Sequence, residues 1–267
     1  MIANLVQAGH QVRAIGRSEA SRQRVVDAGA ELCEDVATAA AGRDVVITML
    51  PDTPDVEAAV LGDGGLASTM ESGQIFIDMS TIVPAAAKRI HDALAERGVA
   101  ALDCPVSGGE QGAIDGTLSV MAGGDAAALE KARPVLEAMS SRITHVGPAG
   151  SGQLTKAANQ IIVAANIQAV AEAVVLLERT GVDLEPALNA LAGGLAGSAV
   201  MEVKRKAFLH GDFEPGFRVE LHNKDMRIVS EAVTENRLAL PVNALVTQLL
   251  AAVEARGPTG CSTMPRC

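Results

Sequence analysis

The sequence contains no tryptophan and no tyrosine, and only 4 of its 267 residues are phenylalanine. Few aromatic rings are therefore available to stack on bases, which argues against a nucleic-acid-binding surface. The formal net charge of -10 and the pI near 5.0 also argue against nucleic acids and anionic membranes as main partners. At 48% hydrophobic residues, the chain is long enough to bury a sizeable core, and we expect two domains.

Cysteine is also scarce. The chain has only Cys33, Cys104, Cys261 and Cys267. Their spacing matches neither a metal site nor a disulfide framework, so we expect reduced thiols, no bound metal and a cytoplasmic location. Residues 1–9 lack the basic start and apolar core of a signal peptide. Polar residues interrupt the apolar stretch 161–177, so we expect no membrane span.

The first half of the chain alternates apolar runs of strand length with helical segments. Strands are expected at 11–16, 44–50, 74–80, 100–105, 118–122 and 143–147, and helices at 19–28 and 84–97. Such alternation is typical of an α/β domain, with a Rossmann-like parallel sheet covered by helices on both faces.

The second half shows helical patterns and no strand signal. Helices are expected at 152–180, 184–191, 199–209, 219–235 and 242–255. Glycine and proline residues separate them. We therefore predict an α/β domain over residues 1–148 and an all-helical domain over 149–267.

A glycine-rich segment follows the strand expected at 100–105. Ser107, Gly108 and Gly109 offer a hydroxyl and unshielded backbone N–H groups, which suit a substrate carboxylate. The alternative is a tight turn that needs glycine for its backbone alone.

Lys156 falls near the start of the long helix, with Asn159 and Gln160 three and four residues later on the same face. Its chain neighbours are small or apolar, so we expect a partly desolvated ammonium. Such burial makes it easier for a lysine to act as acid and base near neutrality. The alternative is a solvated surface lysine.

Lys224 is a further candidate, able to reach a cofactor or substrate from the helical domain. The alternative is an exposed charge that pairs with Asp225 or Glu220. His222 is expected to be structural or solvated. The segment 147–152 superficially resembles a dinucleotide-binding glycine loop, but it lies too late in the chain and outside a βαβ unit, so we interpret it as a hinge.

Together these motifs resemble the β-hydroxyacid dehydrogenase family, with a likeness to its tartronate semialdehyde reducing branch. The matching runs are Asn4-Leu5, Ala8-Gly9-His10, Ile47–Pro51, Ile77–Thr81, the segment 103–124, Lys156 with Asn159-Gln160, Gly193–Ser198, Pro215-Gly216-Phe217 and Lys224-Asp225. The resemblance therefore covers nearly the whole chain.

The resemblance implies a role for each candidate. Lys156 would be the general acid and base, and Asn159 would orient the reacting oxygen. Ser107, Gly108 and Gly109 would hold the substrate carboxylate. The residues implied for the cofactor are Met49, Leu50, Pro51, Thr81 and Lys224. The implied reaction is reduction of 2-hydroxy-3-oxopropionate to D-glycerate, with 3-hydroxyisobutyrate or another small β-hydroxy acid as the alternative substrate, in a homo-oligomer.

The residues after the strand at 11–16 bear on the cofactor. An acidic residue at the end of the second strand of such a domain would bind the ribose of NAD. Gly16 takes that place here, followed by Arg17 and Ser18, with Arg22 one turn later. A guanidinium and a hydroxyl suit the additional phosphate of NADP, so NADP(H) is favoured over NAD(H).

Both ends depart from the family pattern. The first strand and the Gly-x-Gly-x-x-Gly loop are missing before Met1, and the loss of a central strand should destabilise the sheet severely. We expect the natural start to lie upstream. The segment after Arg256 differs from the family sequence and fits a frameshift. The alternative to an active enzyme is an inactive truncated remnant.

Overall fold

The computed structural model describes residues 1–211 and 217–256. Two features of the sequence, Pro215-Gly216 and the segment 257–267 with Cys261 and Cys267, lie outside the described residues. The chain forms two compact units, of which the first is Met1–Lys156 and the second begins at Ala157.

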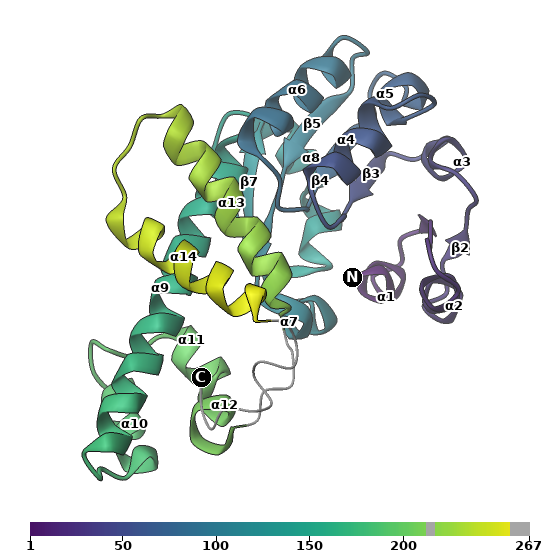
Figure 1. The fold of residues 1–267 in the computed structure, drawn as a ribbon. Coiled ribbons are helices and arrows are strands. Elements are labelled where there is room, and N and C mark those ends of the chain that lie inside the picture. The colour runs from purple at the N-terminus through teal and green to yellow at the C-terminus, as the bar shows by residue number, and fades with distance from the viewer. Residues whose placement is uncertain (212–216, 257–267) are drawn as a thin grey trace. The chain divides into compact units, whose positions relative to one another are not determined.

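The first unit alternates strands and helices (Figure 1). Its elements are α1 (Ile2–Gln7), β1 (Arg13–Ala14), α2 (Glu19–Asp27), β2 (Glu31–Leu32), α3 (Val36–Ala40), β3 (Val45–Thr48), α4 (Thr53–Leu61), α5 (Leu66–Thr69), β4 (Ile75–Asp78), α6 (Pro84–Ala95), β5 (Ala100–Asp103), β6 (Val106–Ser107), α7 (Gly109–Asp115), β7 (Leu118–Gly124), α8 (Ala126–Glu137) and β8 (Ser140–Gly147). The α/β class of this unit is confirmed.

The expected Rossmann-like sheet is confirmed, and antiparallel pairing extends its parallel part, so the sheet as a whole is mixed. Strands β3, β4 and β5 are parallel, but β7 pairs antiparallel with both β5 and β6, and β8 pairs parallel with β7. The six strands follow the order β3-β4-β5-β7-β6, with β8 also against β7. The short connection from β5 to β6, with no crossover helix, permits this reversal. Strands β1 and β2 form a separate two-stranded sheet.

Strand β4 shows why helices are needed on both faces of the sheet. Ile75 and Ile77 belong to an apolar cluster with Leu129 and Leu136 of α8. Phe76, between them, points to the opposite face and joins a cluster with residues of α4, α5 and α6. Alternate side chains of a strand face opposite ways, so a strand that is apolar throughout must be covered twice.

Polar capping residues mark the starts of two helices that the apolar pattern did not predict. Asp52 caps α4 with a 2.7 Å bond from the Thr53 N–H, and Asp125 caps α8 with a 2.8 Å bond from the Ala128 N–H. These residue types supply the acceptors that the first N–H groups of a helix lack.

The second unit is helical throughout its described residues, as expected. It contains most of α9 (Ser151–Arg179), then α10 (Leu184–Ala192), α11 (Ala199–Val203), α12 (Arg205–His210), α13 (Val219–Glu235) and α14 (Pro241–Ala255). A single helix was expected at 199–209; the backbone of Lys204, at φ -94° and ψ 4°, instead separates α11 from α12. Ala164 packs with Met226 and Val246 of α13 and α14, whereas Val170 and Val174 pack with α10 and α11.

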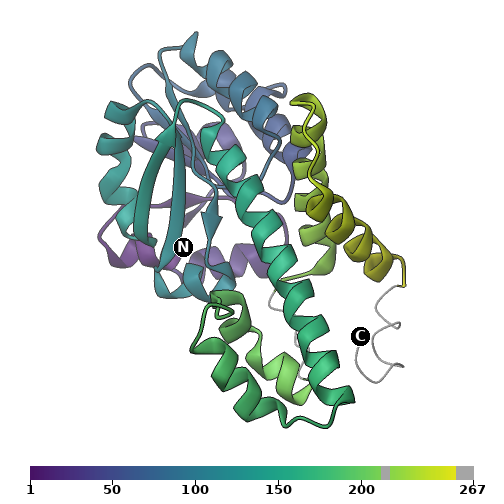
Figure 2. The same cartoon turned by 90° about the vertical axis from the view of Figure 1, so that its left-hand side faces the viewer.

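Helix α9 runs uninterrupted for 29 residues (Figure 2). By length and apolar composition alone it could cross a membrane, and it is the one such helix in the described parts of the chain. A long core helix of a globular protein passes the same test. The packing of its alanine and valine residues against α10, α11, α13 and α14 gives its apolar character a structural reason.

The start of α9 is attached to the end of β5 through Asp103. The Asp103 carboxylate accepts hydrogen bonds from the Gly150 N–H at 2.8 Å and the Gln153 N–H at 2.9 Å. Glycine is required at two neighbouring positions, because a Cβ at Gly123 would lie 2.5 Å from the Asp103 Oδ1 and one at Gly152 would collide with the Asp103 carbonyl oxygen. This attachment explains why the first turns of α9 belong to the first unit.

Burial raises the pKa of the Asp103 carboxyl above its ordinary value of 3.8, and this effect exceeds the lowering by the two N–H donors. The folded protein therefore holds this proton more tightly than the unfolded chain does. The resulting stability is complete below pH 3.8 and is lost as the pH rises through the elevated folded-state pKa. We expect the free energy of unfolding of the wild type, minus that of Asp103→Asn, to decrease as the pH rises from about 4, by at most about 1.4 kcal/mol per pH unit.

Urea unfolding at a series of pH values between 4 and 7 measures this difference. Asp63→Asn, which removes an exposed carboxylate, is the matched control with which the Asp103→Asn difference is compared. A constant or increasing difference for Asp103→Asn would contradict the account of its burial.

Candidate active site

The carboxyl ends of β3 and β4 form one edge of the sheet, because the two strands are parallel and adjacent. The residues expected to bind the cofactor, Met49, Leu50, Pro51 and Thr81, follow these strands directly. Open α/β sheets bind ligands at this edge. The structure therefore brings these sequence-predicted residues together at a place suited to a ligand, and the Met49 side chain there is 52% exposed.

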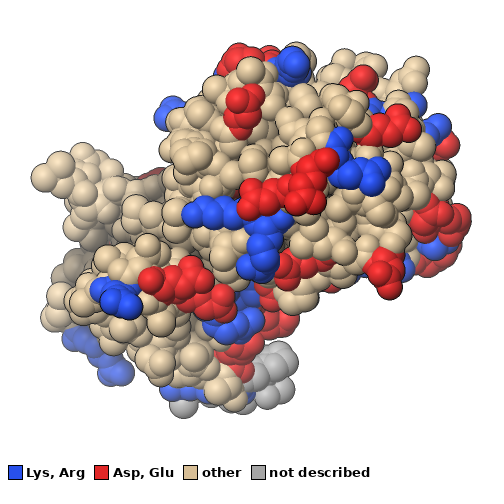
Figure 3. Space-filling view, turned by 90° about the horizontal axis from the view of Figure 1, so that it is seen from above, with Lys and Arg blue, Asp and Glu red and all other residues tan. Residues whose placement is uncertain are grey.

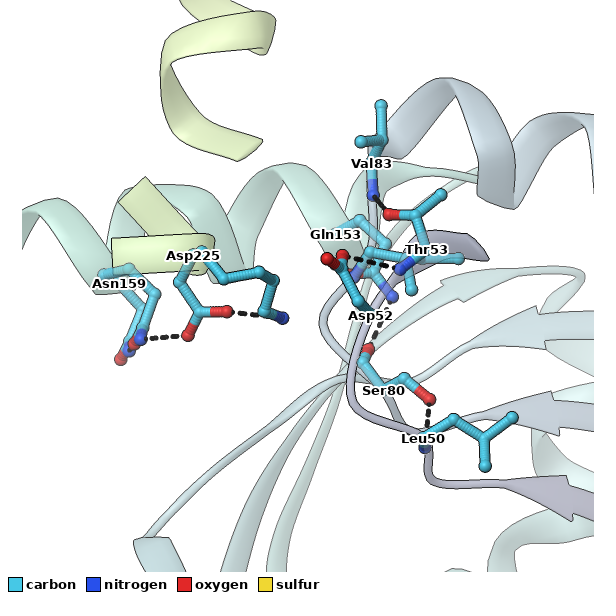
Figure 4. A network of polar contacts seen from close by, with 11 residues as sticks. Leu50, Asp52, Thr53, Ser80, Val83, Gln153, Asn159 and Asp225 are labelled. Atoms are coloured by element: carbon cyan, nitrogen blue, oxygen red, sulfur yellow. Dashed lines mark hydrogen bonds and ion pairs between the residues drawn. The ribbon is translucent and has the colours of Figure 1, made fainter. Parts of the chain in front are cut away.

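Hydrogen bonds connect the two segments that follow β3 and β4 (Figure 4). The Leu50 N–H donates to the Ser80 Oγ at 2.8 Å, and the Val83 N–H donates to the Thr53 Oγ1 at 3.1 Å. Thr48 and Asp78, the last residues of the strands, are bonded through their side chains at 2.8 Å. The backbone around Leu50 and Thr81 is thus held at several points.

Lys156 lies on the second turn of α9 and is 8% exposed. The expectation of desolvation is therefore confirmed, and the alternative of a solvated surface lysine is wrong. Gln153, one turn earlier, is 1% exposed and bonds the segment after β4 through both atoms of its side-chain amide. Gln153 and Asp103 were not among the site residues predicted from the sequence. Both are polar residues in otherwise apolar or glycine-rich sequence, and this pattern could have identified them.

The glycine-rich segment is more regular than the loop expected from the sequence. Ser107 ends β6, where it pairs with Ser119 of β7, and Gly108 is the N-cap of α7. Gly108 and Gly109 have φ angles of 135° and 65°, which favour glycine. The first N–H groups of a helix lack intrahelical acceptors, so the start of α7 can donate hydrogen bonds to an anion.

The second unit contains a chain of polar contacts with Asn159 at one end. The Asn159 Nδ2 donates to the Gln160 Oε1 at 2.8 Å, and the Gln160 Nε2 donates to the Asp225 Oδ2 at 2.6 Å. The Lys224 Nζ lies 2.7 Å from the Asp225 Oδ1 (Figure 4). Sequence reasoning did not identify Gln160 and Asp225 as the connection between the two candidates.

The structure corrects the expected exposure of Lys224 and selects between the two alternatives left open for His222. Lys224 was expected either to reach a ligand or to be an exposed charge paired with Asp225 or Glu220. It does pair with Asp225, but the pair is buried, with 9% and 4% of the two side chains exposed. His222 is 5% exposed and contacts Phe217 with ring centroids 5.7 Å apart, so it is not a solvated residue. Residues 222–226 of α13 are all buried, although most are polar, because α14 and α9 cover this helix.

The end of β1 holds the residues expected near a cofactor phosphate. The Arg17 guanidinium is 62% exposed and pairs with Asp55 at 2.9 Å. Ser18 caps α2 by accepting from the Ser21 N–H at 3.2 Å. The Arg22 Nε donates to the Gly16 carbonyl at 3.1 Å, so Arg22 also serves to hold this turn together.

Gly16 leaves no space for the acidic residue that would bind an NAD ribose. A Cβ at this position would lie 2.5 Å from the backbone nitrogen of Arg22, which cannot move without disturbing α2. The residues present at the end of β1 are thus cationic or neutral.

The described residues offer neither a reactive cysteine nor a cluster of metal ligands. Cys33 and Cys104 are free and buried, and burial strongly raises the pKa of the Cys104 thiol, which disfavours a nucleophilic thiolate. No group of three or more His, Cys, Asp or Glu side chains in ranges 1–211 and 217–256 is placed to hold a metal ion. On the face shown in Figure 3, basic and acidic side chains lie interspersed, unlike the basic patch of a nucleic-acid-binding surface.

Comparisons with known proteins identify the family of the chain. Residues 1–147 match the family model described as the NAD binding domain of 6-phosphogluconate dehydrogenase. Residues 150–263 match the model described as NAD-binding of NADP-dependent 3-hydroxyisobutyrate dehydrogenase.

Individual relatives cover nearly the whole chain. The 2-hydroxy-3-oxopropionate reductase of Escherichia coli strain K12 is 38% identical over 96% of this chain and 88% of its own length. The NAD-dependent L-serine dehydrogenase of Pseudomonas aeruginosa is 37% identical over 93% of this chain and 86% of its own. The solved structure of Mycobacterium tuberculosis 3-hydroxyisobutyrate dehydrogenase with L-serine is 33% identical, covers 95% of this chain and 89% of its own, and has a TM-score of 0.87. The chain therefore belongs to the β-hydroxyacid dehydrogenase family, whose members are nicotinamide-dependent oxidoreductases.

Proposed function

We propose that this protein reduces 2-hydroxy-3-oxopropionate to D-glycerate with NADP(H), and that Lys156 is its general acid and base. The observation that carries the proposal is the placement of Lys156. It is buried on a helix whose first turn is bonded to the carboxyl ends of β4 and β5. The similarity to the Escherichia coli reductase supports the choice of substrate.

A nicotinamide cofactor, when bound, supplies the hydride that the carbonyl carbon of the substrate receives. The carbonyl oxygen gains negative charge at the same time and needs a proton. Lys156 donates that proton from its Nζ, becomes neutral and is reprotonated from solvent. In the oxidative direction the neutral Lys156 accepts the hydroxyl proton. A buried lysine suits both directions because the loss of water lowers the preference for its charged form.

The remaining candidates hold the substrate in this proposal. Ser107, Gly108 and Gly109 bind its carboxylate with a hydroxyl and the N–H groups at the start of α7. Asn159, three residues after Lys156 on α9, orients the reacting oxygen. Lys224 contributes to cofactor binding. Because its ammonium is paired with Asp225, the cofactor competes with Asp225 for this ammonium.

Arg17 and Ser18 favour NADP(H) over NAD(H) in the proposal, since Gly16 excludes an acidic side chain. Met49, Leu50, Pro51 and Thr81 line the cofactor at the carboxyl edge of the sheet. NAD(H) is the alternative, because a relative at 37% identity is named an NAD-dependent enzyme.

A second candidate function is the oxidation of 3-hydroxyisobutyrate or L-serine. The similarity to the Mycobacterium tuberculosis enzyme and to the Pseudomonas dehydrogenase favours it. All of these substrates carry a carboxylate and a β-oxygen, so Ser107 to Gly109 and Lys156 suit each of them equally well.

We further propose that the protein works as a homo-oligomer in the cytoplasm. Large apolar side chains are exposed on the helices of the second unit, among them Ile162, Leu176 and Leu245 at 61%, 65% and 58%. In this proposal these side chains lie in the interface between subunits, since contiguous exposed apolar surface marks such interfaces.

A substrate panel with the wild type and Lys156→Met tests the central proposal. We expect the highest kcat/KM for 2-hydroxy-3-oxopropionate with NADPH, and a loss of kcat by about 10²- to 10⁴-fold in Lys156→Met, because general acid catalysis contributes about this much. Lys131→Met, at an exposed position of α8, should retain full activity. A higher kcat/KM for 3-hydroxyisobutyrate or L-serine would favour the second candidate, and near-normal kcat in Lys156→Met would exclude Lys156 as the acid.

The cofactor proposal predicts a selective effect of Arg17→Ala. A charge-assisted hydrogen bond contributes about 1.5–3 kcal/mol, so the KM for NADPH should rise roughly 10- to 100-fold while the KM for NADH changes little. Arg24→Ala, at an exposed arginine of the same α2 region, serves as the control. Equal increases for both cofactors would contradict a phosphate-binding role, and failure of the folded wild type to bind NADPH would favour the inactive remnant.

A further inference from the structure

The side chain of Gln153 is the most constrained polar group near Lys156. It is 1% exposed, and both atoms of its amide are bonded. The Oε1 accepts the Ile82 N–H at 3.1 Å, and the Nε2 donates to the Ser80 carbonyl at 2.8 Å. These two backbone groups lie on either side of Thr81, which is proposed to line the cofactor. The Gln153 side-chain amide therefore binds the chain immediately before and after Thr81.

The contact continues from Ser80 to the end of the neighbouring strand. The Ser80 Oγ accepts the Leu50 N–H at 2.8 Å, and the Ser80 N–H donates to the Asp78 Oδ1 at 3.1 Å. Gln153, Ser80 and Leu50 therefore form an unbroken path of hydrogen bonds (Figure 4). All of these residues belong to the first compact unit.

The backbone of Gln153 is fixed as firmly as its side chain. Its N–H donates to the Asp103 Oδ2 at 2.9 Å. Lys156 follows three residues later on the same side of α9, since residues three apart on a helix are neighbours. A shift of the helix start relative to the segment 80–82 would leave buried amide groups without partners, which is strongly disfavoured.

An apolar side chain of the same size would fill this place without the desolvation that a buried amide requires. Packing alone therefore does not account for glutamine. The two hydrogen bonds, one accepted and one donated, match the Ile82 N–H and the Ser80 carbonyl. This match defines the relative position of α9 and the segment after β4.

We propose that Gln153 is a positioning residue for the reaction, and that Ser80 extends its effect to Leu50. Through the Ser80–Ile82 backbone it sets the place of Thr81 and Leu50, which line the cofactor, relative to Lys156, which moves the proton. The inference rests on the proposed function of Lys156. Hydride and proton must reach the same carbonyl group, so an error of about 1 Å in this placement lowers the rate by about 100-fold.

Gln153→Met tests the proposal because methionine keeps the approximate volume and removes both hydrogen bonds. Gln23→Met, at an exposed glutamine of α2, is the matched control. With the substrate that gives the highest kcat/KM in the wild type, we expect kcat of Gln153→Met to fall by about 100-fold and the KM for that substrate to stay within about threefold. The kinetic isotope effect on kcat with 4-deuterated NADPH should increase, because hydride transfer becomes rate-limiting.

A readout without substrate accompanies the kinetics. Amide hydrogen exchange at Ile82 should accelerate in Gln153→Met, because its acceptor is gone, while exchange at Ile77 in the core of β4 should not. If Gln153→Met does not fold, Ser80→Ala takes its place. It removes only the acceptor of the Leu50 N–H and should lower kcat by about 10-fold with an unchanged fold.

The outcomes separate this inference from the proposed function. A Gln153→Met protein with kcat within threefold of the wild type, or with a loss matched by its unfolded fraction and an unchanged isotope effect, would overturn the positioning role alone. A different preferred substrate would overturn the substrate assignment and still test Gln153. A wild type that turns over no member of the panel would overturn both.

Discussion

The arrangement of this protein depends on a buried carboxylate that meets the start of a long helix. Asp103 ends a central strand and accepts the N–H groups of Gly150, directly before α9, and of Gln153 in its first turn. The two groups satisfy each other's hydrogen bonding, because the first N–H groups of a helix lack intrahelical acceptors and a buried carboxyl requires donors. Gly123 and Gly152 permit the close approach. Lys156, three residues after Gln153 in the same compact unit, takes its position relative to the sheet from this contact.

The proposed chemistry places different demands on different elements, and the fold supplies each separately. A lysine gives up its proton more easily when it is desolvated, and Lys156 is buried. In the proposal, the substrate carboxylate meets the N–H groups at the start of α7. A phosphate needs an accessible cation, and the exposed Arg17 follows β1. Gln153 and Ser80 connect two of these places by hydrogen bonds, so the strand ends act as a common frame.

Local sequence patterns predicted much of this structure. Most of the incorrect predictions concern pairing between residues far apart in the sequence. Apolar runs identified β3, β4 and β5, and helical periodicity identified α9 and α13, because burial determines both signals. The antiparallel pairing of β7 has no local signature, so the sheet was expected to be parallel. Lys224 was judged by the usual exposure of lysine, yet Asp225 and the packing of α13 bury it. Gln153 was missed because its partners, Ser80 and Ile82, are more than 70 residues away.

Residue-resolved amide hydrogen exchange of the unliganded wild type tests the central claim most directly. The first amides of a helix ordinarily exchange fast, since they have no intrahelical acceptor. The Asp103 carboxylate should instead protect the Gly150 and Gln153 amides to about the same degree as those in the core of β4. Exchange of these two amides at the rate of an open chain would show that α9 is not anchored to the sheet and would contradict the account of how Lys156 is placed.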